Sequence, residues 1–218
     1  MKTTLKAQIE SFKAGTNHIK VLVVMLIASF IIFPGYSPGA SVSTGEVVTY
    51  PVPTGEVSSS DFQVQVANHK IDTYMARVLD PPFARKRWDH GGPYSFTNFD
   101  MSGSVVVRIT SKRSLRNVII RPQSYGIKPT LVNDHTISFT LDRPLKFSVE
   151  PDGKKAPLLL FANPIETDAT KAGDKGVVYF RPGVHKPEKI VLGSNQTLYL
   201  AGGAVVRAEV LVKGDNIR

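Results

Sequence analysis

The sequence predicts an all-β protein in which a β-sandwich is followed by the first coils of a parallel β-helix. Apolar and polar residues alternate with a period of two over much of the chain after residue 45, which is typical of strands that bury one face. Turn-forming residues separate these runs, and no stretch of helical periodicity interrupts them. Residues 177–218 instead consist of very short apolar runs between Gly, Asn and Asp, which favours stacked coils.

Length and composition bound the class of protein. The 218 residues fit one or two domains, and 42% apolar with 21% charged residues is typical of a globular chain. The chain has no cysteine, which excludes a disulfide framework, a thiolate metal site and a cysteine nucleophile. The five histidines are dispersed, so the sequence predicts no metal site, and no motif calls for a cofactor.

Residues 1–40 are predicted to be a signal peptide or an N-terminal anchor. Four lysines precede a 13-residue apolar run at residues 21–33, and Pro34, Gly35, Pro38 and Gly39 follow it. The run is shorter than the roughly 20 residues that span a bilayer and fits the core of an export signal. We therefore expect a secreted or periplasmic protein. An uncleaved anchor, which would hold the chain at a membrane, and a buried core segment are the alternatives.

The charge balance is basic. Removal of residues 1–40 takes away four lysines and Glu10, which lowers the net charge from +9 to +6. An exported basic protein attracts acidic polysaccharide, although ordinary solubility explains the same charge. The basic residues are scattered and no nucleic-acid motif is present, so we expect no nucleic-acid partner.

Residues 45–164 are predicted to form the β-sandwich domain. Phe62, Val64 and Val66 alternate with Gln63 and Gln65. Similar alternation or β-rich apolar runs recur at residues 105–109, 118–120, 137–141, 145–149 and 158–161. The turn signals between them are Asn68-His69, Pro81-Pro82, Gly91-Gly92-Pro93, Asn133-Asp134, Asp152-Gly153 and Asn163-Pro164. Short strands at this spacing predict an antiparallel sandwich.

Residues 165–176 are polar and predict a linker, and residues 177–218 predict the start of a truncated β-helix. Asn195 and Asn216 are 21 residues apart, close to the length of one coil, so we expect them to stack and to bond backbone groups at the turn. This arrangement would put Leu198 beside Ile217. The competing interpretation is an antiparallel hairpin that turns at Ala201-Gly202-Gly203-Ala204. Because about three repeats are needed for stability, we expect the chain to be the N-terminal part of a longer protein.

Several motifs resemble bacterial β-helix glycoside hydrolases, namely the dextranase-like family 49 and the polygalacturonase-like family 28 of the pectin-lyase-like superfamily. The resemblance to their N-terminal β-sandwich lies in residues 118–122 (VIIRP), 147–151 (FSVEP) and 159–164 (LLFANP). Residues 179–185 (YFRPGVH) and 198–206 (LYLAGGAVV) are similar to the beginning of their right-handed parallel β-helix. The resemblance implies a parent enzyme that degrades polysaccharides.

The resemblance also implies that the catalytic acids lie on later coils. Polygalacturonase-like members carry them in Asn-Thr-Asp and Asp-Asp pieces, followed by Gly-His-Gly and Arg-Ile-Lys, and this sequence contains none of the four. Hydrolysis of a glycosidic bond requires a pair of carboxyl groups at a set separation, and no pair is assigned that role here. We therefore predict no catalytic residue on these 218 residues and no activity of the chain alone.

The densest cluster of functional-looking side chains contains Trp88, Asp89, His90 and Tyr94, which we take as candidate carbohydrate contacts. An aromatic ring beside charged donors can stack on a sugar and bond its hydroxyls. The competing interpretation is an edge loop whose Trp and Tyr fill the core. Two alternatives to the hydrolase also stay open: a noncatalytic carbohydrate-binding or adhesin module, and a polysaccharide lyase of the same architecture.

Overall fold

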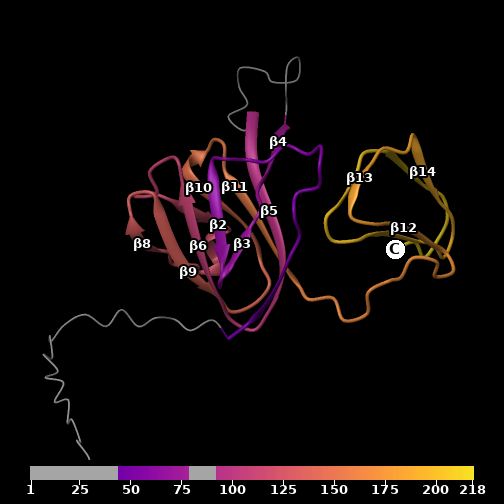
Figure 1. The fold of residues 1–218 in the computed structure, drawn as a ribbon, viewed down its shortest axis with the longest axis horizontal. Helices are drawn as coiled ribbons and strands as arrows, with labels where there is room; N and C mark the ends of the chain where they lie inside the picture. The colour runs from indigo at the N-terminus through magenta and orange to yellow at the C-terminus, as the bar shows by residue number, and fades with distance from the viewer. Residues whose placement is uncertain (1–43, 79–91) are drawn as a thin grey trace, which may run out of the picture. The chain divides into compact units, whose positions relative to one another are not determined.

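The computed structural model describes residues 44–78 and 92–218, and strands form nearly all of its regular structure (Figure 1). No α-helix occurs in these residues, and one short 3-10 turn, η1 (Gln123–Tyr125), is present. No membrane-spanning helix is present among these residues. The prediction of an all-β fold is confirmed. The predicted signal segment, residues 1–40, lies outside the described residues.

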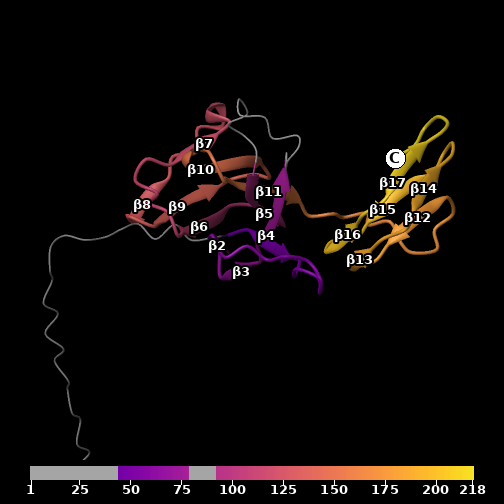
Figure 2. The same ribbon diagram turned by 90° about the horizontal axis from the view of Figure 1, so that it is seen from above.

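Two sheets form the sandwich, and they lie as two layers in Figure 2. The six-stranded sheet has the order β1 (Glu46–Thr49), β5 (Gly92–Ser102), β11 (Leu158–Pro164), β10 (Lys146–Lys154) and β7 (Ile119–Arg121), with β4 (Tyr74–Val78) also paired to β5. The five-stranded sheet has the order β3 (His69–Ile71), β2 (Phe62–Val66), β6 (Val105–Ser111), β9 (Thr136–Leu141) and β8 (Thr130–Asn133).

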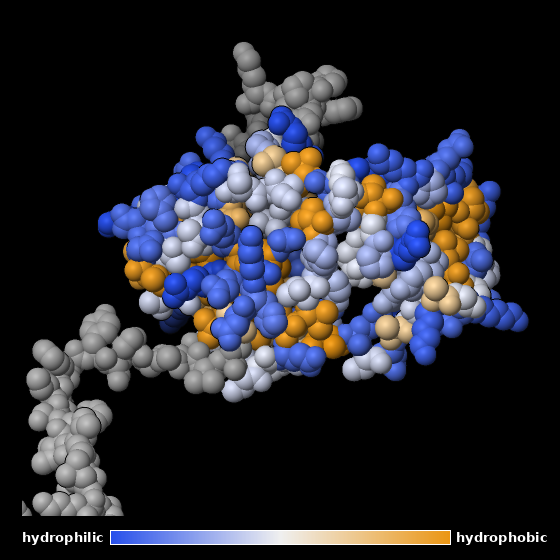
Figure 3. Space-filling model, in the orientation of Figure 1, coloured by the Kyte–Doolittle hydropathy of each residue, from blue (hydrophilic) through white to orange (hydrophobic). Residues whose placement is uncertain are grey.

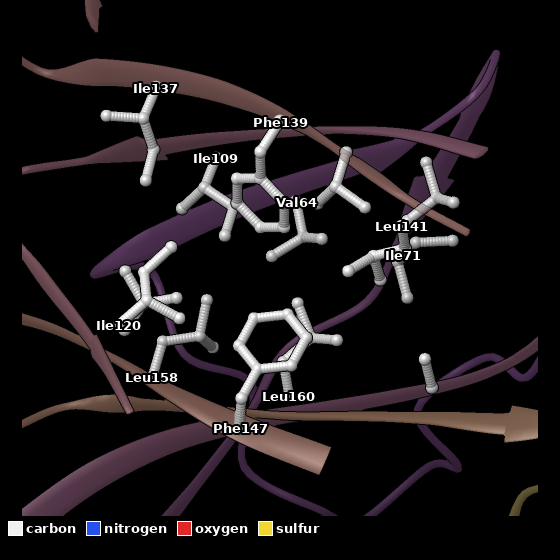
Figure 4. Close-up of a cluster of buried hydrophobic side chains, with 14 of the residues drawn as sticks. Val64, Ile71, Ile109, Ile120, Ile137, Phe139, Leu141, Phe147, Leu158 and Leu160 are labelled. Carbon is white, nitrogen blue, oxygen red and sulfur yellow. The ribbon is translucent and has the colours of Figure 1, made fainter. Parts of the chain in front are cut away.

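The sandwich core lies between these sheets. Along β2, burial alternates as the sequence predicts, with the apolar residues inside and Gln63 and Gln65 exposed. Phe139 of β9 meets Phe147 of β10 edge to face, with ring centroids 5.8 Å apart, and so joins the two sheets (Figure 4). The period-two pattern therefore exists because one face of each strand contacts the other sheet.

The predicted strand directions and three of the predicted turns in the sandwich need correction. The predicted antiparallel sandwich contains one parallel pair, β5 with β11, because the long connection between these strands lets them run in the same direction. Gly92 and Pro93, predicted to lie in a turn, are the first residues of β5. The turns predicted at Asp152-Gly153 and Asn163-Pro164 are likewise parts of strands, because β10 and β11 continue to Lys154 and Pro164. Pro93 lies in the antiparallel ladder with β4, where it faces Arg77.

Residues 165–176 form no strand, and six short strands follow them. They are β12 (Val177–Phe180), β13 (Gly183–His185), β14 (Lys189–Leu192), β15 (Thr197–Leu200), β16 (Ala204–Val206) and β17 (Glu209–Val212). They pair in parallel as β12 with β15, β13 with β16, and β14 with β17, which stacks a second coil on the first. The boundaries of separate domains stay a prediction.

The parallel register excludes the hairpin. Leu200 lies opposite Phe180 and Val205 opposite Val184, whereas a hairpin would pair Leu200 with Val205. The prediction that Leu198 lies beside Ile217 is wrong, however. The Arg218 N–H donates to the Gln196 carbonyl, and the Leu198 N–H donates to the Arg218 carbonyl at 2.8 Å. In a parallel ladder this pattern places Arg218 opposite Thr197.

The two coil corners depend on particular residues. Asn195 and Asn216 both have left-handed backbone conformations, with φ of 61° and 55°. They stack as predicted, but the Asn216 amide donates to the Asn195 side-chain oxygen at 2.8 Å rather than to backbone. At the Gly202-Gly203 corner, a Cβ on Gly202 would lie 1.9 Å from the ring of Tyr50. Gly202 is therefore needed because the Tyr50 ring lies directly against it.

Candidate functional site: a tyrosine and carboxylate cluster

The predicted carbohydrate contacts are only partly described. Trp88, Asp89 and His90 lie outside the described residues. Tyr94 is half-buried in β5, and its ring lies 6.3 Å from Phe96, which in turn stacks on Tyr74 at 4.8 Å. Tyr94 thus belongs to a row of aromatic rings along β4 and β5, and its contact with carbohydrate stays a prediction.

Asp100 lies on the same side of β5 as Tyr94. Strand β5 alternates, with Phe99 and Met101 buried in the core and Asp100 half-buried on the other face. Asp100 follows Tyr94 by six positions, which is about 20 Å along a strand. The two side chains therefore belong to different parts of that face.

Neighbouring strands supply the partners of Asp100. Asn163 of β11 lies directly opposite it in the parallel register and donates to its Oδ1 at 3.4 Å. Tyr50, which follows β1, donates its hydroxyl to Oδ2. Both oxygens of the carboxylate therefore accept a hydrogen bond from a residue of the same sheet region.

A second phenol and carboxylate pair involves the coils. The Tyr199 hydroxyl donates to Glu166 of the predicted linker at 2.5 Å. Tyr179 and Tyr199 are opposite each other in the β12 and β15 register, and their rings stack 5.2 Å apart with an interplanar angle of 19°. The two tyrosines therefore stack because they occupy equivalent positions in successive coils.

Each carboxylate of the two pairs, Tyr50 with Asp100 and Tyr199 with Glu166, affects the pKa of both tyrosines. Burial raises the pKa of Tyr50, and its hydrogen bond to Asp100 raises it further. The hydrogen bond to Glu166 is the main cause that raises the pKa of Tyr199, to about 12. Glu166 also raises the pKa of Tyr50, and Asp100 that of Tyr199. We call this set the tyrosine–carboxylate cluster: Tyr50, Asp100, Asn163, Glu166, Tyr179 and Tyr199.

The arrangement fits binding better than catalysis. Asp100 and Glu166 both accept hydrogen bonds from phenols whose raised pKa values keep them protonated at neutral pH, so both carboxylates are already engaged by tyrosines. The stacked tyrosines present an aromatic surface with polar edges, which is suited to a sugar ring. Among residues 44–78 and 92–218, no group of three or more His, Cys, Asp or Glu side chains could hold a metal ion.

Sequence reasoning missed this cluster. Its members are distributed along the sequence from Tyr50 to Tyr199, so no local motif connects them. The one available signal was the pair Tyr179 and Tyr199, twenty positions apart and therefore one coil apart.

The segment between β1 and β2 also contacts the second coil. Glu56 accepts from Arg207 at 2.8 Å, and only 11% of the Glu56 side chain is exposed. The Tyr50 ring lies against Gly202 in the same coil. Side chains of this segment therefore make both polar and apolar contacts with residues that follow β15.

Comparison with known proteins supports the fold and goes no further. No family model matches the chain, and no curated protein does. Among solved structures, Dex49A from Penicillium minioluteum is similar, with a TM-score of 0.53 and 21% sequence identity. The match covers 77% of this chain and 47% of that chain, so the matched part is about half of Dex49A. At this identity the likeness shows a shared all-β fold, which agrees with the sandwich and coils described above.

Proposed function

We propose that the chain is the N-terminal part of an exported polysaccharide-degrading glycoside hydrolase, with the catalytic coils beyond residue 218. Two observations support this proposal. The sequence motifs resemble dextranase-like and polygalacturonase-like enzymes, and the fold is similar to that of Dex49A. The stacking of parallel coils after a sandwich is the single feature on which the proposal mainly rests.

The exposure of the second coil supports further coils. Ile190 and Leu192 of β14 are 5% and 2% exposed, so they point into the coil interior. Val210 and Val212 of β17 lie directly opposite them in the parallel register but are 46% and 54% exposed. A third coil would cover these valines in the way that the second covers the first.

The test compares the chain with the same chain extended along its gene. The extended protein is expected to release reducing ends from dextran or polygalacturonate, and the chain without residues 1–40 is expected to release none. Hydrolytic activity in the short protein after removal of trace contaminants would contradict the assignment of catalysis to later coils. Products that carry a new carbon–carbon double bond would show a lyase instead.

Export has its own test. The lysine-rich start and apolar run motivate it. Cell fractionation followed by N-terminal sequencing is expected to find the protein outside the cytoplasm and shortened near residue 40. A cytoplasmic protein that still begins at Met1 would contradict export, and a membrane-bound one that begins at Met1 would show an anchor.

One observation favours a second candidate, a noncatalytic carbohydrate-binding module. The tyrosine–carboxylate cluster offers stacked rings, while its two carboxylates already accept hydrogen bonds from phenols. Binding of a glycan by the extended protein, without any cleavage of it, would favour this candidate over the hydrolase.

A further inference from the structure

The outer face of the five-stranded sheet contains a shallow depression whose lining residues are mostly of polar types. It lies over β2, β3 and β6, and its polar lining side chains are Gln63, Gln65, Asn68, Lys70, Arg108 and Thr110. Hydrophilic side chains cover much of this part of the surface in Figure 3. The depression thus offers amides, a hydroxyl and two cations, but no aromatic ring.

Strand register aligns these groups in rows. Gln65 of β2 lies opposite Lys70 of β3 on one side and Arg108 of β6 on the other. Arg108 in turn faces Ser138 of β9, which extends the polar row across a fourth strand. Adjacent strands are about 4.8 Å apart, so the two cationic residues are held about 10 Å apart with an amide between them.

No acidic side chain of the described residues neutralises the positive charge in the depression. No acidic side chain is among its lining residues, and within the described ranges neither Lys70 nor Arg108 takes part in an ion pair. Lys112 and Arg116, by contrast, pair with Asp61 and Asp134. Charge complementarity therefore favours an anionic ligand at this face rather than a neutral one.

We propose that this face is a noncatalytic binding site for a carboxylated oligosaccharide, such as a chain of uronic acids. The Arg108 guanidinium and the Lys70 ammonium would bind carboxylates on the glycan, and the guanidinium is suited to bidentate contact. Gln63, Gln65 and Thr110 would bond sugar hydroxyls with both donors and acceptors. The proposal rests on the proposed function only in taking a polysaccharide as the ligand, and it requires no catalytic coil.

The test is calorimetric titration of the full chain with a hexamer of galacturonate and with a neutral glucose oligomer of the same length. We expect the galacturonate hexamer to bind and the neutral oligomer to bind at least tenfold more weakly. Because charged hydrogen bonds are lost, Arg108→Ala and Lys70→Ala are each expected to weaken binding by about tenfold. Arg108→Lys is expected to recover part of the loss, since it keeps the charge but not the planar fork.

Matched controls separate a site from overall charge. Lys112→Ala and Arg116→Ala remove one positive charge each at ion pairs outside the depression and should leave affinity nearly unchanged. An equal loss in these controls would overturn the proposal. It would also be overturned by equal affinity for the neutral oligomer, by no binding at millimolar glycan, or by single-stranded DNA of equal charge that binds as tightly with the same variant dependence.

The outcome is independent of the hydrolase assignment. Lys70, Gln65 and Arg108 are exposed, so their replacement should preserve the thermal unfolding midpoint and the fold can be checked for each variant. Absence of hydrolysis by the extended protein would leave the binding result standing. Loss of binding would leave any measured hydrolysis standing.

Discussion

The sandwich and the coils bury their apolar side chains in different ways. In the sandwich, residues of two sheets enclose a core in which Phe99, Val107, Leu158 and Leu160 are fully buried. In the coils, Ile190 and Leu192 are the buried apolar side chains, and both belong to the first coil. A sandwich encloses its core between its own two sheets, whereas a coil depends on the next coil to cover its apolar side chains.

The largest difference should appear between truncation of a buried sandwich residue and truncation of an apolar residue on the open side of the coils. Leu160→Ala in the sandwich should lower the free energy of unfolding by about 2–5 kcal/mol, because it leaves a cavity between two sheets. Val210→Ala on the open side of the second coil should change it by less than about 0.5 kcal/mol. Urea unfolding followed by circular dichroism measures both. Equal losses would mean that the coil core is already covered.

A smaller effect is expected at the buried carboxylate of the sandwich. Glu150 is 5% exposed and accepts from Arg121 at 3.0 Å and Ser148 at 2.7 Å. Arg121→Ala should cost about 1–3 kcal/mol, because it removes a charged partner from a buried acceptor. Arg143→Ala, which breaks an exposed pair with Asp142, should cost less than about 0.5 kcal/mol in the same urea experiment. A larger loss for Arg143→Ala would contradict the role of burial.

The coil corner should respond more weakly still. Loss of a hydrogen bond from a buried group lowers the free energy of unfolding by roughly 1–3 kcal/mol. Because Asn195 and Asn216 are exposed, Asn195→Ala is expected to lower it by only about 0.5–1.5 kcal/mol. Asn195→Gly keeps the left-handed backbone accessible and removes only the side-chain bond, so its cost should be smaller. Hydrogen exchange at β14 to β17 measures the change locally. A faster exchange in β6 as well would show that the coils and the sandwich open together.

The smallest effect concerns alkaline pH. The folded pKa of Tyr199, about 12, lies above the ordinary value near 10. A raised pKa contributes stability that is fully present below about pH 10 and is lost as the pH rises toward 12. Tyr199→Phe should therefore reduce the fall in unfolding free energy over this window, while Tyr125→Phe in the exposed η1 turn should not. Identical pH profiles for the two variants would contradict the hydrogen bond to Glu166.

Much of the fold could be predicted because local patterns determine it. The alternation in β2 and β9 predicts which side chains face the core, and the 21-residue spacing of Asn195 and Asn216 predicts parallel coils. Burial of Glu150 departs from the pattern, because Arg121 and Ser148 compensate for a charge that the period alone would place outside.

The candidate site could not be predicted in the same way. Asp100 meets Tyr50 only because β1 and β5 pair, and it meets Asn163 only because β5 and β11 run parallel. Both contacts depend on pairing between strands that are remote in the sequence. The depression on the outer face likewise requires the register of β2, β3 and β6, although the alternating Gln63 and Gln65 already indicated an exposed polar row.

The corners of the coils give the fold a tolerance for changes in length. Val177 and Thr197 are paired 20 positions apart, Gly183 and Ala204 are 21 apart, and Lys189 and Glu209 are again 20 apart. One residue is therefore gained at the Gly202-Gly203 corner and lost at the next, while every strand keeps its partner. Insertions and deletions at corners can accumulate in evolution without disturbing the ladders, so new loops can be added around the coils while the scaffold is inherited unchanged.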